Sequence, residues 1–507
     1  MHRDLLNYTS GLGRLMVLGS SIAVLSISAH AQTAMTVTLN PSSLGRTIPS
    51  DFEGLSIEMF YVVDLGTTTY PTTNGDDDVI ADAWFDSGSS AIGTLFQTLG
   101  VKSMRIGGTT TEEPTLLDAN ATYPQQYDAA HVSNFAQQWG LELIWDIPVA
   151  ADYNLSTYTS YIESMVSTQK SKGQNFKEIW EIGNEPDQQD VGPSTYDARF
   201  DAYLGALRSD IGTSVQVLGP SELSTTSYIG ALMADPEYDS SSAPWHSNIY
   251  AFSHHFYPFG CASGQSSLDA AIGEMLELHY TLYTDLYNSW AATAASYGYN
   301  TRYDEGNSFC GGGYSGASNA FAAALWGLDV LEYHAHNTTL GGINFHVADG
   351  ATYSAFSPQL LSSTYTTQGL GYGMLAFNTD GAGQVVPTTL SGPAGAGTTL
   401  NVTAYGTKMS NGSETAIVIN KTSVIKGDDT DFTLTVVPGA SYKTASVYYL
   451  QAPNNDPTQT SGITFGGSSV SSTGTWSGST TTFTANSSGN FIIPISYTEA
   501  AVINMHN

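Results

Sequence analysis

The amino-acid sequence predicts a (β/α)8 barrel joined to a β-sandwich. Between residues 49 and 385, eight short apolar or alternating runs recur, each followed by a helical pattern. Strands that alternate with helices are typical of a barrel, although the spacing alone also fits a doubly wound open sheet. After about residue 385 the helical periodicity disappears, and Gly, Pro, Asn and Ser turns separate strand-like runs. This change predicts a β-sandwich over residues 386–507.

The expected elements follow one another along the chain. The segment MTVTLNP at 35–41 alternates like the C-terminal runs, which predicts that residues 32–48 add a strand to the sandwich. Helices are expected at 160–173 and 316–337, within a barrel that covers residues 49–385. The expected barrel strands are FEGLSIEMF (52–60), VKSMRIGG (101–108), LELIWDIPVA (141–150), FKEIWEIGN (176–184), VQVLGP (215–220), IYAFSHHFYP (249–258), NTRYDEGNS (300–308) and GGINFHVADG (341–350).

The first 31 residues have the pattern of a signal peptide. Arg3 and Arg14 precede the apolar run LMVLGSSIAVLSI, and Ala29 and Ala31 form a small-x-small cleavage site. The alternative is a membrane anchor, but this run is too short for one, and no other stretch of about 20 apolar residues occurs. We therefore expect a secreted protein whose mature chain starts after Ala31.

Charge and composition exclude several classes of partner. The chain has 46 acidic and 15 basic side chains, a formal net charge of −31. Such a surface repels nucleic acid and anionic membranes, and it fits an acidic habitat in which many carboxylates are partly protonated. We expect no metal or cofactor, because neither HExxH nor Cys-rich spacing occurs, and GDDD at 75–78 is read as a solvated loop.

Two glutamates stand where expected strands end. Glu185 follows the strand at 176–184, and Glu305 lies near the end of the strand at 300–308. Active sites of (β/α)8 barrels form at these strand ends, and glycoside hydrolysis needs two carboxylates that straddle one bond. We expect Glu185 to act as the acid/base and Glu305 as the nucleophile if they are about 5 Å apart. Asn184 is then placed to bind the sugar hydroxyl beside the reacting carbon.

Other interpretations of these residues remain open. Glu185 precedes a proline and also fits a capping carboxylate at a helix start. Asp304 is the rival of Glu305, because alternation along a strand predicts that only one of the two faces the pocket. Arg105 is expected in an ion pair inside the barrel, and Glu181 in a salt bridge or in packing around its strand.

Several motifs resemble glycoside hydrolase family 79, the β-glucuronidase and heparanase-like enzymes. They are WEIGNEPD (180–187), YDEGNSFCGGGYSG (303–316), ALWGLDVLEY (324–333) and INFHVADG (343–350). The resemblance implies a (β/α)8 barrel with a β-sandwich and a retaining mechanism that uses Glu185 and Glu305. It also implies that Glu58 binds sugar hydroxyls, that Tyr257 touches the nucleophile, and that Tyr353 lies at the glycone site.

In such enzymes the loop after the nucleophile binds the sugar carboxylate through backbone N–H groups and tyrosine hydroxyls. Here Gly312, within a run of three glycines, is expected to present its N–H, and Tyr314 is expected to supply a hydroxyl. Cys261 and Cys310 are the two cysteines, 49 positions apart. They are either buried thiols or a disulfide, and the disulfide is expected because both loops leave neighbouring strands at the same barrel mouth.

The sequence therefore predicts a secreted, exo-acting, retaining β-glucuronidase that acts on carbohydrates or glycosides. One alternative is a β-glucosidase or β-xylosidase with the same mechanism, and another is a non-catalytic carbohydrate-binding protein. An aryl β-glycoside assay separates these readings.

Overall fold

The computed structural model describes residues 33–59, 69–71, 77–79, 90–112, 126–150, 163, 166–167, 170, 177–348, 350–359, 362–380, 383–392 and 401–507. The expected signal peptide lies outside these residues, as does most of the expected helix at 160–173. Among the helices that the structure describes, none has the length and apolar character needed to cross a membrane.

A closed barrel of eight parallel strands forms the centre of the molecule. The strand order is β10-β11-β2-β5-β6-β7-β8-β9, so each strand pairs with its sequence neighbour and the last pairs with the first. All eight expected strands are confirmed. Nearly every residue of these strands is buried, which suits strands that helices cover on the outside. The barrel strands are β2 (Glu53–Glu58), β5 (Ser103–Gly107), β6 (Glu142–Ile147), β7 (Glu178–Ile182), β8 (Val217–Glu222), β9 (Ile249–Phe256), β10 (Thr301–Gly306) and β11 (Ile343–Val347).

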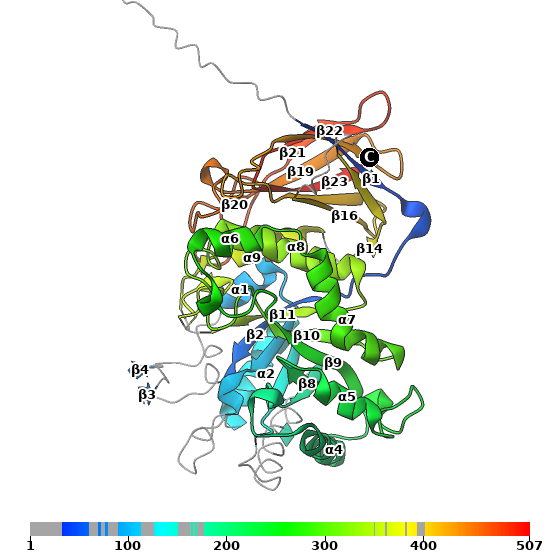
Figure 1. Cartoon of the computed structure of the whole chain (residues 1–507), viewed down its shortest axis with the longest axis vertical. Helices are drawn as coiled ribbons and strands as arrows, with labels where there is room; N and C mark the ends of the chain where they lie inside the picture. Colours follow the sequence, from blue (N-terminus) through cyan, green and yellow to red (C-terminus); the bar gives the residue numbers. More distant parts are fainter. Residues whose placement is uncertain are drawn as a thin grey trace, which may run out of the picture.

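Helices surround the barrel, and two of them also support the C-terminal domain. The described helices are α1 (Ser90–Leu99), α2 (Gln126–Trp139), α4 (Pro193–Asp210), α5 (Ser227–Ala234), α6 (Leu268–Met275), α7 (Tyr280–Ser296), α8 (Phe321–Asn337) and α9 (Gly369–Asp380). Nearly every residue of α8 is buried, because α8 lies between the barrel and the β-domain (Figure 1). Helices α8 and α9 approach closely at Gly373, where an added Cβ would lie 2.4 Å from the carbonyl oxygen of Ala324.

The β-domain consists of two sheets with an apolar core between them. One sheet has the order β15-β1-β18-β22, with β1 (Thr33–Leu39), β15 (Thr388–Ser391), β18 (Phe432–Val437) and β22 (Phe491–Ile495). The N-terminal strand β1 is thus part of this sheet, as the sequence predicts. The other sheet begins just before the expected boundary at 386. It contains β14 (Gln384–Val385), β16 (Val402–Lys408), β17 (Glu414–Asn420), β23 (Glu499–His506), β19 (Thr444–Gln451), β20 (Thr464–Phe465) and β21 (Thr481–Thr484).

A buried ion pair joins the two domains. Lys421, just after β17, places its Nζ 2.6 Å from Oδ2 of Asp329 in α8, and both side chains are about 1% exposed. The other oxygen of Asp329 accepts hydrogen bonds from Thr403 (2.7 Å) and Tyr405 (2.8 Å), both in β16. This network fixes one face of the β-domain on the barrel.

Candidate active site

Two glutamates meet at the C-terminal ends of the barrel strands. Glu185 lies three residues after the end of β7, and Glu305 lies near the end of β10, with β8 and β9 between them. One carboxylate oxygen of each glutamate and a ring nitrogen of His255 all lie within 4.8 Å of one another. The side chain of Glu185 is 15% exposed and that of Glu305 8%. The structure therefore brings the two predicted carboxyl groups together at the opening of the barrel, where its strands end.

Both Glu305 and its neighbour Asp304 are engaged inside the barrel, although alternation predicts that only one of them faces inward. The register between β10 and β9 shifts between Arg302 and Glu305, so the strict two-residue alternation fails at this point. Asp304 is fully buried and accepts a hydrogen bond from Ser221 in β8, whereas Glu305 is 6% exposed. Glu305 is thus the carboxylate that solvent reaches.

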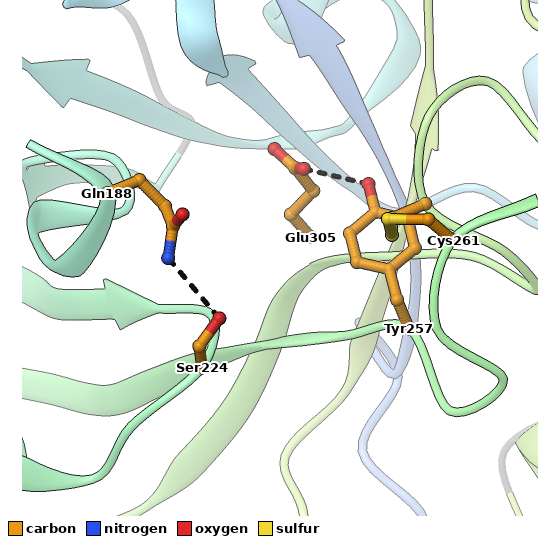
Figure 2. Close-up of a disulfide and its surroundings, with 6 residues drawn as sticks. Gln188, Ser224, Tyr257, Cys261 and Glu305 are labelled. Atoms are coloured by element: carbon orange, nitrogen blue, oxygen red, sulfur yellow. Dashed lines mark hydrogen bonds between the residues drawn. A yellow bond between two sulfur atoms is a disulfide. The ribbon is translucent and has the colours of Figure 1, made fainter. Parts of the chain in front are cut away.

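Glu305 is held from both sides. The hydroxyl of Tyr257 donates to Oε1 over 2.8 Å (Figure 2), and Nη1 of Arg105 donates to Oε2 over 2.6 Å. Arg105 is completely buried and forms the expected interior ion pair, with two hydrogen bonds of 2.6 and 2.7 Å to Glu181. Its contact with Glu305 was not expected. The guanidinium of Arg105 therefore also fixes the orientation of Glu305, the candidate nucleophile.

His255 lies between the two glutamates. Its Nδ1 is 2.8 Å from Oε1 of Glu185 and 3.6 Å from Oε1 of Glu305. Burial alone would lower the pKa of His255, but the charges of Glu305, Glu185 and Asp304 and the hydrogen bond to Glu185 raise it to about 9. The imidazole ring therefore favours its positively charged form at neutral pH and lies against both carboxyl groups.

The surroundings of Glu305 favour its ionised form. Burial alone would raise the pKa of Glu305, but the charges of His346, His255 and Arg105 and the hydrogen bond from Tyr257 outweigh it. The pKa of Glu305 is consequently held well below its ordinary range. An ionised carboxylate at this position is what a nucleophile requires.

Asn184 and Glu58 border the same opening. The side-chain oxygen of Asn184 accepts a hydrogen bond of 2.8 Å from Arg105, which fixes the orientation of the amide. At the end of β2, Oε2 of Glu58 accepts a hydrogen bond of 2.6 Å from the hydroxyl of Thr110, and Oε1 lies 3.2 Å from Nε2 of His346. Both predicted side chains thus have a fixed orientation.

Tyr353 lies on the side of the opening that Tyr257 occupies. Its ring centroid is 6.4 Å from that of Tyr257 and 6.1 Å from that of His346, and the residue is 4% exposed. These contacts bring the exits of β9 and β11 together beside Glu305.

The predicted disulfide is present beside this group. Cys261 and Cys310 are bonded, with their Cα atoms 4.2 Å apart, and Figure 2 shows the bond next to Tyr257. The two loops are also paired through their backbones, since N–H of Cys310 donates to Gly260 and N–H of Ala262 donates to Cys310. The loop after β10 is therefore anchored to the loop that carries Tyr257.

The glycine run in the loop after β10 has an unusual backbone. Gly311, Gly312 and Gly313 have φ values of +73°, +85° and +83°, which other residues rarely adopt. Within the described part of the chain, their N–H groups donate no hydrogen bond, and the carbonyl of Gly312 accepts one of 2.7 Å from Thr352. Tyr314 is half-buried, and its hydroxyl forms no hydrogen bond to the described residues of the site.

The same donors form the cluster that would suit a metal ion best. Glu185, His255 and Glu305 bring three ligand atoms together, and Glu181, His255 and Asp304 form a second such group. His255 belongs to both groups, and its Nδ1 is already used by Glu185. The contacts of His255 with Glu185 and Glu305 already join these side chains in an ion-pair network.

The sequence argument missed His346 and the second contact of Arg105. His346 lies in β11, with Nδ1 3.1 Å from Ser56 and 3.5 Å from Oε2 of Glu305. Burial alone would lower the pKa of His346, but the charge of Glu305 and the contact with Glu58 raise it. The available signal was its place in the motif INFHVADG at the end of a predicted barrel strand.

Buried carboxyls make the stability of the fold dependent on pH. Burial raises the pKa of Glu112, Glu178 and Glu499 to about 7 and that of Glu222 to about 8. Between the unfolded value of about 4.3 and these folded values, the folded chain binds more protons, so the free energy of unfolding falls as pH rises. We expect a higher midpoint of urea unfolding at pH 5 than at pH 8. An equal or higher midpoint at pH 8 would contradict this.

Comparisons with known proteins agree with this architecture. Residues 404–502 match the protein-family model of the glycosyl hydrolase family 79 C-terminal beta domain. The chain is also similar in structure to a 4-O-α-L-rhamnosyl-β-D-glucuronidase from Fusarium oxysporum, with 17% identity, a TM-score of 0.65, and coverage of 92% of this chain and 99% of that one. No curated protein sequence matches the chain.

Two further solved structures share the fold. One is a family 51 arabinofuranosidase from Xanthomonas axonopodis pv. citri, with 13% identity, a TM-score of 0.65, and coverage of 94% of this chain and 100% of that one. The other is a family 44 xyloglucanase from Paenibacillus polymyxa, with 11% identity, a TM-score of 0.57, and coverage of 94% and 100%. All three named relatives are glycosidases, and at these identities the likeness is one of fold.

Proposed function

We propose that this chain, whose C-terminal domain is of the glycoside hydrolase family 79 type, is a secreted, exo-acting, retaining β-glucuronidase. One observation carries the retaining mechanism: carboxyl oxygens of Glu185 and Glu305 lie within 4.8 Å of each other at the mouth of one barrel. Retaining glycosidases hold their two carboxyl groups about 5–5.5 Å apart, whereas inverting enzymes need roughly 6.5–9.5 Å for a water molecule.

The reaction assigns a different role to each glutamate. The ionised Glu305 attacks the anomeric carbon while Glu185 donates its proton to the leaving oxygen, and a covalent glycosyl-enzyme forms. Glu185 then removes a proton from water, and the water oxygen displaces Glu305. Two inversions give net retention. Arg105 and Tyr257 orient the attacking carboxylate, and both of its oxygens are hydrogen-bonded in the resting state.

Recognition of a glucuronate is supported by the loop after β10. The N–H groups of Gly311–313 have no acceptor among the described residues, so they are available to a sugar carboxylate. The similar Fusarium structure is a glucuronidase by its printed name. Secretion is supported by the N-terminal sequence pattern and by the disulfide, which is typical of oxidising compartments. N-terminal sequencing of the mature protein checks it, with Gln32 as the expected first residue.

The N–H donors of Gly311–313 carry no charge, so they also favour a second candidate function. Among the described residues, Arg105 is the one arginine or lysine that contacts the glutamate pair, and carboxylates already occupy it. A β-glucosidase or β-xylosidase with the same mechanism needs no cation for its substrate. Hydrolysis of aryl β-glucuronide, β-glucoside and β-xyloside at acidic pH separates the two, with NMR of the first-formed anomer. Preference for a neutral sugar defeats the glucuronidase, and an inverted product defeats the mechanism.

Replacing Tyr257 with phenylalanine removes one hydrogen bond to Glu305. A hydrogen bond to a charged group contributes about 1.5–3 kcal/mol, so we expect kcat/KM to fall roughly 10- to 150-fold. Because this hydroxyl lowers the pKa of Glu305, the acidic limb of the pH–rate profile moves to higher pH. A profile that keeps its acidic limb while the rate falls would show that Tyr257 acts only through packing.

A further inference from the structure

The backbone at the exit of β7 is held at three successive N–H groups, each by a different element. The N–H of Gly183 donates to the carbonyl of Ile147 in β6 over 2.8 Å, and the N–H of Glu185 donates to the carbonyl of Ser221 in β8 over 3.0 Å. The N–H between them, that of Asn184, donates to Oε1 of Glu112 over 3.2 Å. The middle anchor is thus a side chain, whereas the other two are main-chain carbonyls.

Glu112 connects three consecutive strand exits. It follows the short helix η3 (Thr109–Thr111) behind β5 and is 3% exposed. Besides Asn184, it accepts hydrogen bonds from the N–H of Val149 (2.9 and 3.0 Å) and from that of Ala150 (2.8 Å), both behind β6. Each carboxyl oxygen therefore accepts two backbone N–H groups. These donors lower the pKa of Glu112, but burial raises it more strongly, to about 7, and the protonated group keeps acceptor lone pairs for them.

The conformation of Glu185 explains why such an anchor matters. Its φ of +46° and ψ of 55° lie in the left-handed region, which a residue with a side chain occupies only when its surroundings hold it there. The same conformation directs its carboxylate to His255 and toward Glu305. Freeing the preceding N–H gives this backbone a way to relax, and the carboxyl group then moves away from the leaving oxygen.

We propose that Glu112 is a positioning residue for the acid/base: its buried carboxyl group accepts the Asn184 N–H, fixes that backbone and thereby fixes the orientation of Glu185. The proposal rests on the proposed function of Glu185 as proton donor. A proton donor must lie within hydrogen-bond reach of the leaving oxygen, and a misplacement of about 1 Å can cost roughly 10²-fold in rate. Glu112 itself does not contact the substrate.

Glu112→Gln is the variant that tests this role. It keeps the size of the side chain and one acceptor oxygen, but it turns the other oxygen into an NH2 group that faces backbone donors. Arg199→Gln is the matched control, because Arg199 binds the carbonyls of Val149 and Ala150 without reaching Asn184. Both variants disturb the exit of β6, and only the first changes the group that accepts the N–H of Asn184 at the exit of β7.

The measurement is kcat/KM over a series of aryl β-glycosides of the sugar that the wild type hydrolyses best. Proton donation matters little for a 2,4-dinitrophenolate leaving group and greatly for phenolate or methoxide. We expect Glu112→Gln to lower kcat/KM about 10²-fold for the poor leaving groups and less than about 3-fold for dinitrophenolate. Arg199→Gln should lower all values by the same factor. A uniform loss in Glu112→Gln, or no loss, would overturn the proposal.

Further measurements distinguish a failure of the proposed function from a failure of the Glu112 anchor. If the wild type hydrolyses none of the glycosides, the proposed function is wrong and the anchor is not. The same holds if kcat/KM of Glu185→Ala does not depend on the leaving group. A crystal structure of Glu112→Gln tests the anchor without any assay, and an unmoved Glu185 in it overturns the proposal. If Glu112→Gln does not fold, Glu112→Asp, which keeps the charge but shortens the reach, is measured in the same series.

Discussion

Replacing Glu305 with glutamine lowers kcat by roughly 10⁴-fold or more, the size of loss that follows when one member of a catalytic unit is removed. The amide has nearly the same shape, so Tyr257 and Arg105 keep a partner of similar size, but it cannot attack the anomeric carbon. Arg105 is buried and loses one of its carboxylate partners, so a moderate loss of stability accompanies the loss of rate. The wild type and the variant are compared in kcat on the same aryl glycoside.

Azide distinguishes the roles of the two glutamates. In Glu305→Gly the small anion takes the place of the nucleophile and yields the α-glycosyl azide, whereas in Glu185→Gly it attacks the glycosyl-enzyme and yields the β-glycosyl azide. Glu237→Gln, at a half-buried position between the end of α5 and the start of β9, serves as the control with unchanged kcat. A Glu305→Gln variant with wild-type rate would eliminate Glu305 as the nucleophile.

Replacing Lys421 with methionine should destabilise the chain by about 3–5 kcal/mol, because the change leaves a buried charge without its partner. Asp329 keeps only the two neutral donors Thr403 and Tyr405 in a position that is 1% exposed. The free energy of unfolding in urea measures the effect. The barrel mouth is formed by other strand ends, so the kcat of the folded fraction should stay within about 2-fold of the wild type.

The double variant Lys421→Met/Asp329→Asn is the internal control. It removes the unpaired charge and keeps an acceptor for Thr403 and Tyr405, so it should recover a large part of the lost stability. Lys426→Met serves as the matched surface control, since Lys426 pairs with the exposed Glu277. Such exposed pairs contribute about 0–1 kcal/mol. If the Lys421 and Lys426 changes lower the free energy of unfolding by the same amount, the interdomain ion pair stabilises the chain no more than a surface pair does.

Patterns along the chain were sufficient to predict the barrel and the β-domain. Eight apolar runs predict the eight barrel strands, and the loss of helical periodicity predicts the β-domain, because both depend on local sequence periodicity. The glutamate pair was predictable for a related reason. Strand ends in a parallel barrel converge on one rim, so Glu185 and Glu305 come together although they are far apart in sequence.

Features that depend on three-dimensional neighbours were not predictable in this way. The engagement of both Asp304 and Glu305 inside the barrel was not predictable, because it accompanies a register shift against β9, which is a property of the paired strands and not of one strand. The contact between Arg105 and Glu305 crosses the barrel interior over 200 positions of sequence. No sequence motif marks Glu112, because these hydrogen bonds come from backbone N–H groups, which almost any residue could supply.

The strand β1 can pair with its neighbours in the sheet only after most of the chain has been synthesised. β1 pairs with β15 on one side and with β18 on the other, so the earliest described strand fills a gap between strands made several hundred residues later. Until the ribosome has released the last third of the chain, Thr33–Leu39 has no sheet to join. Such a long delay makes closure of this sheet a late, slow event. A fragment with residues 386–507 alone would expose two unpaired edges and is expected to aggregate.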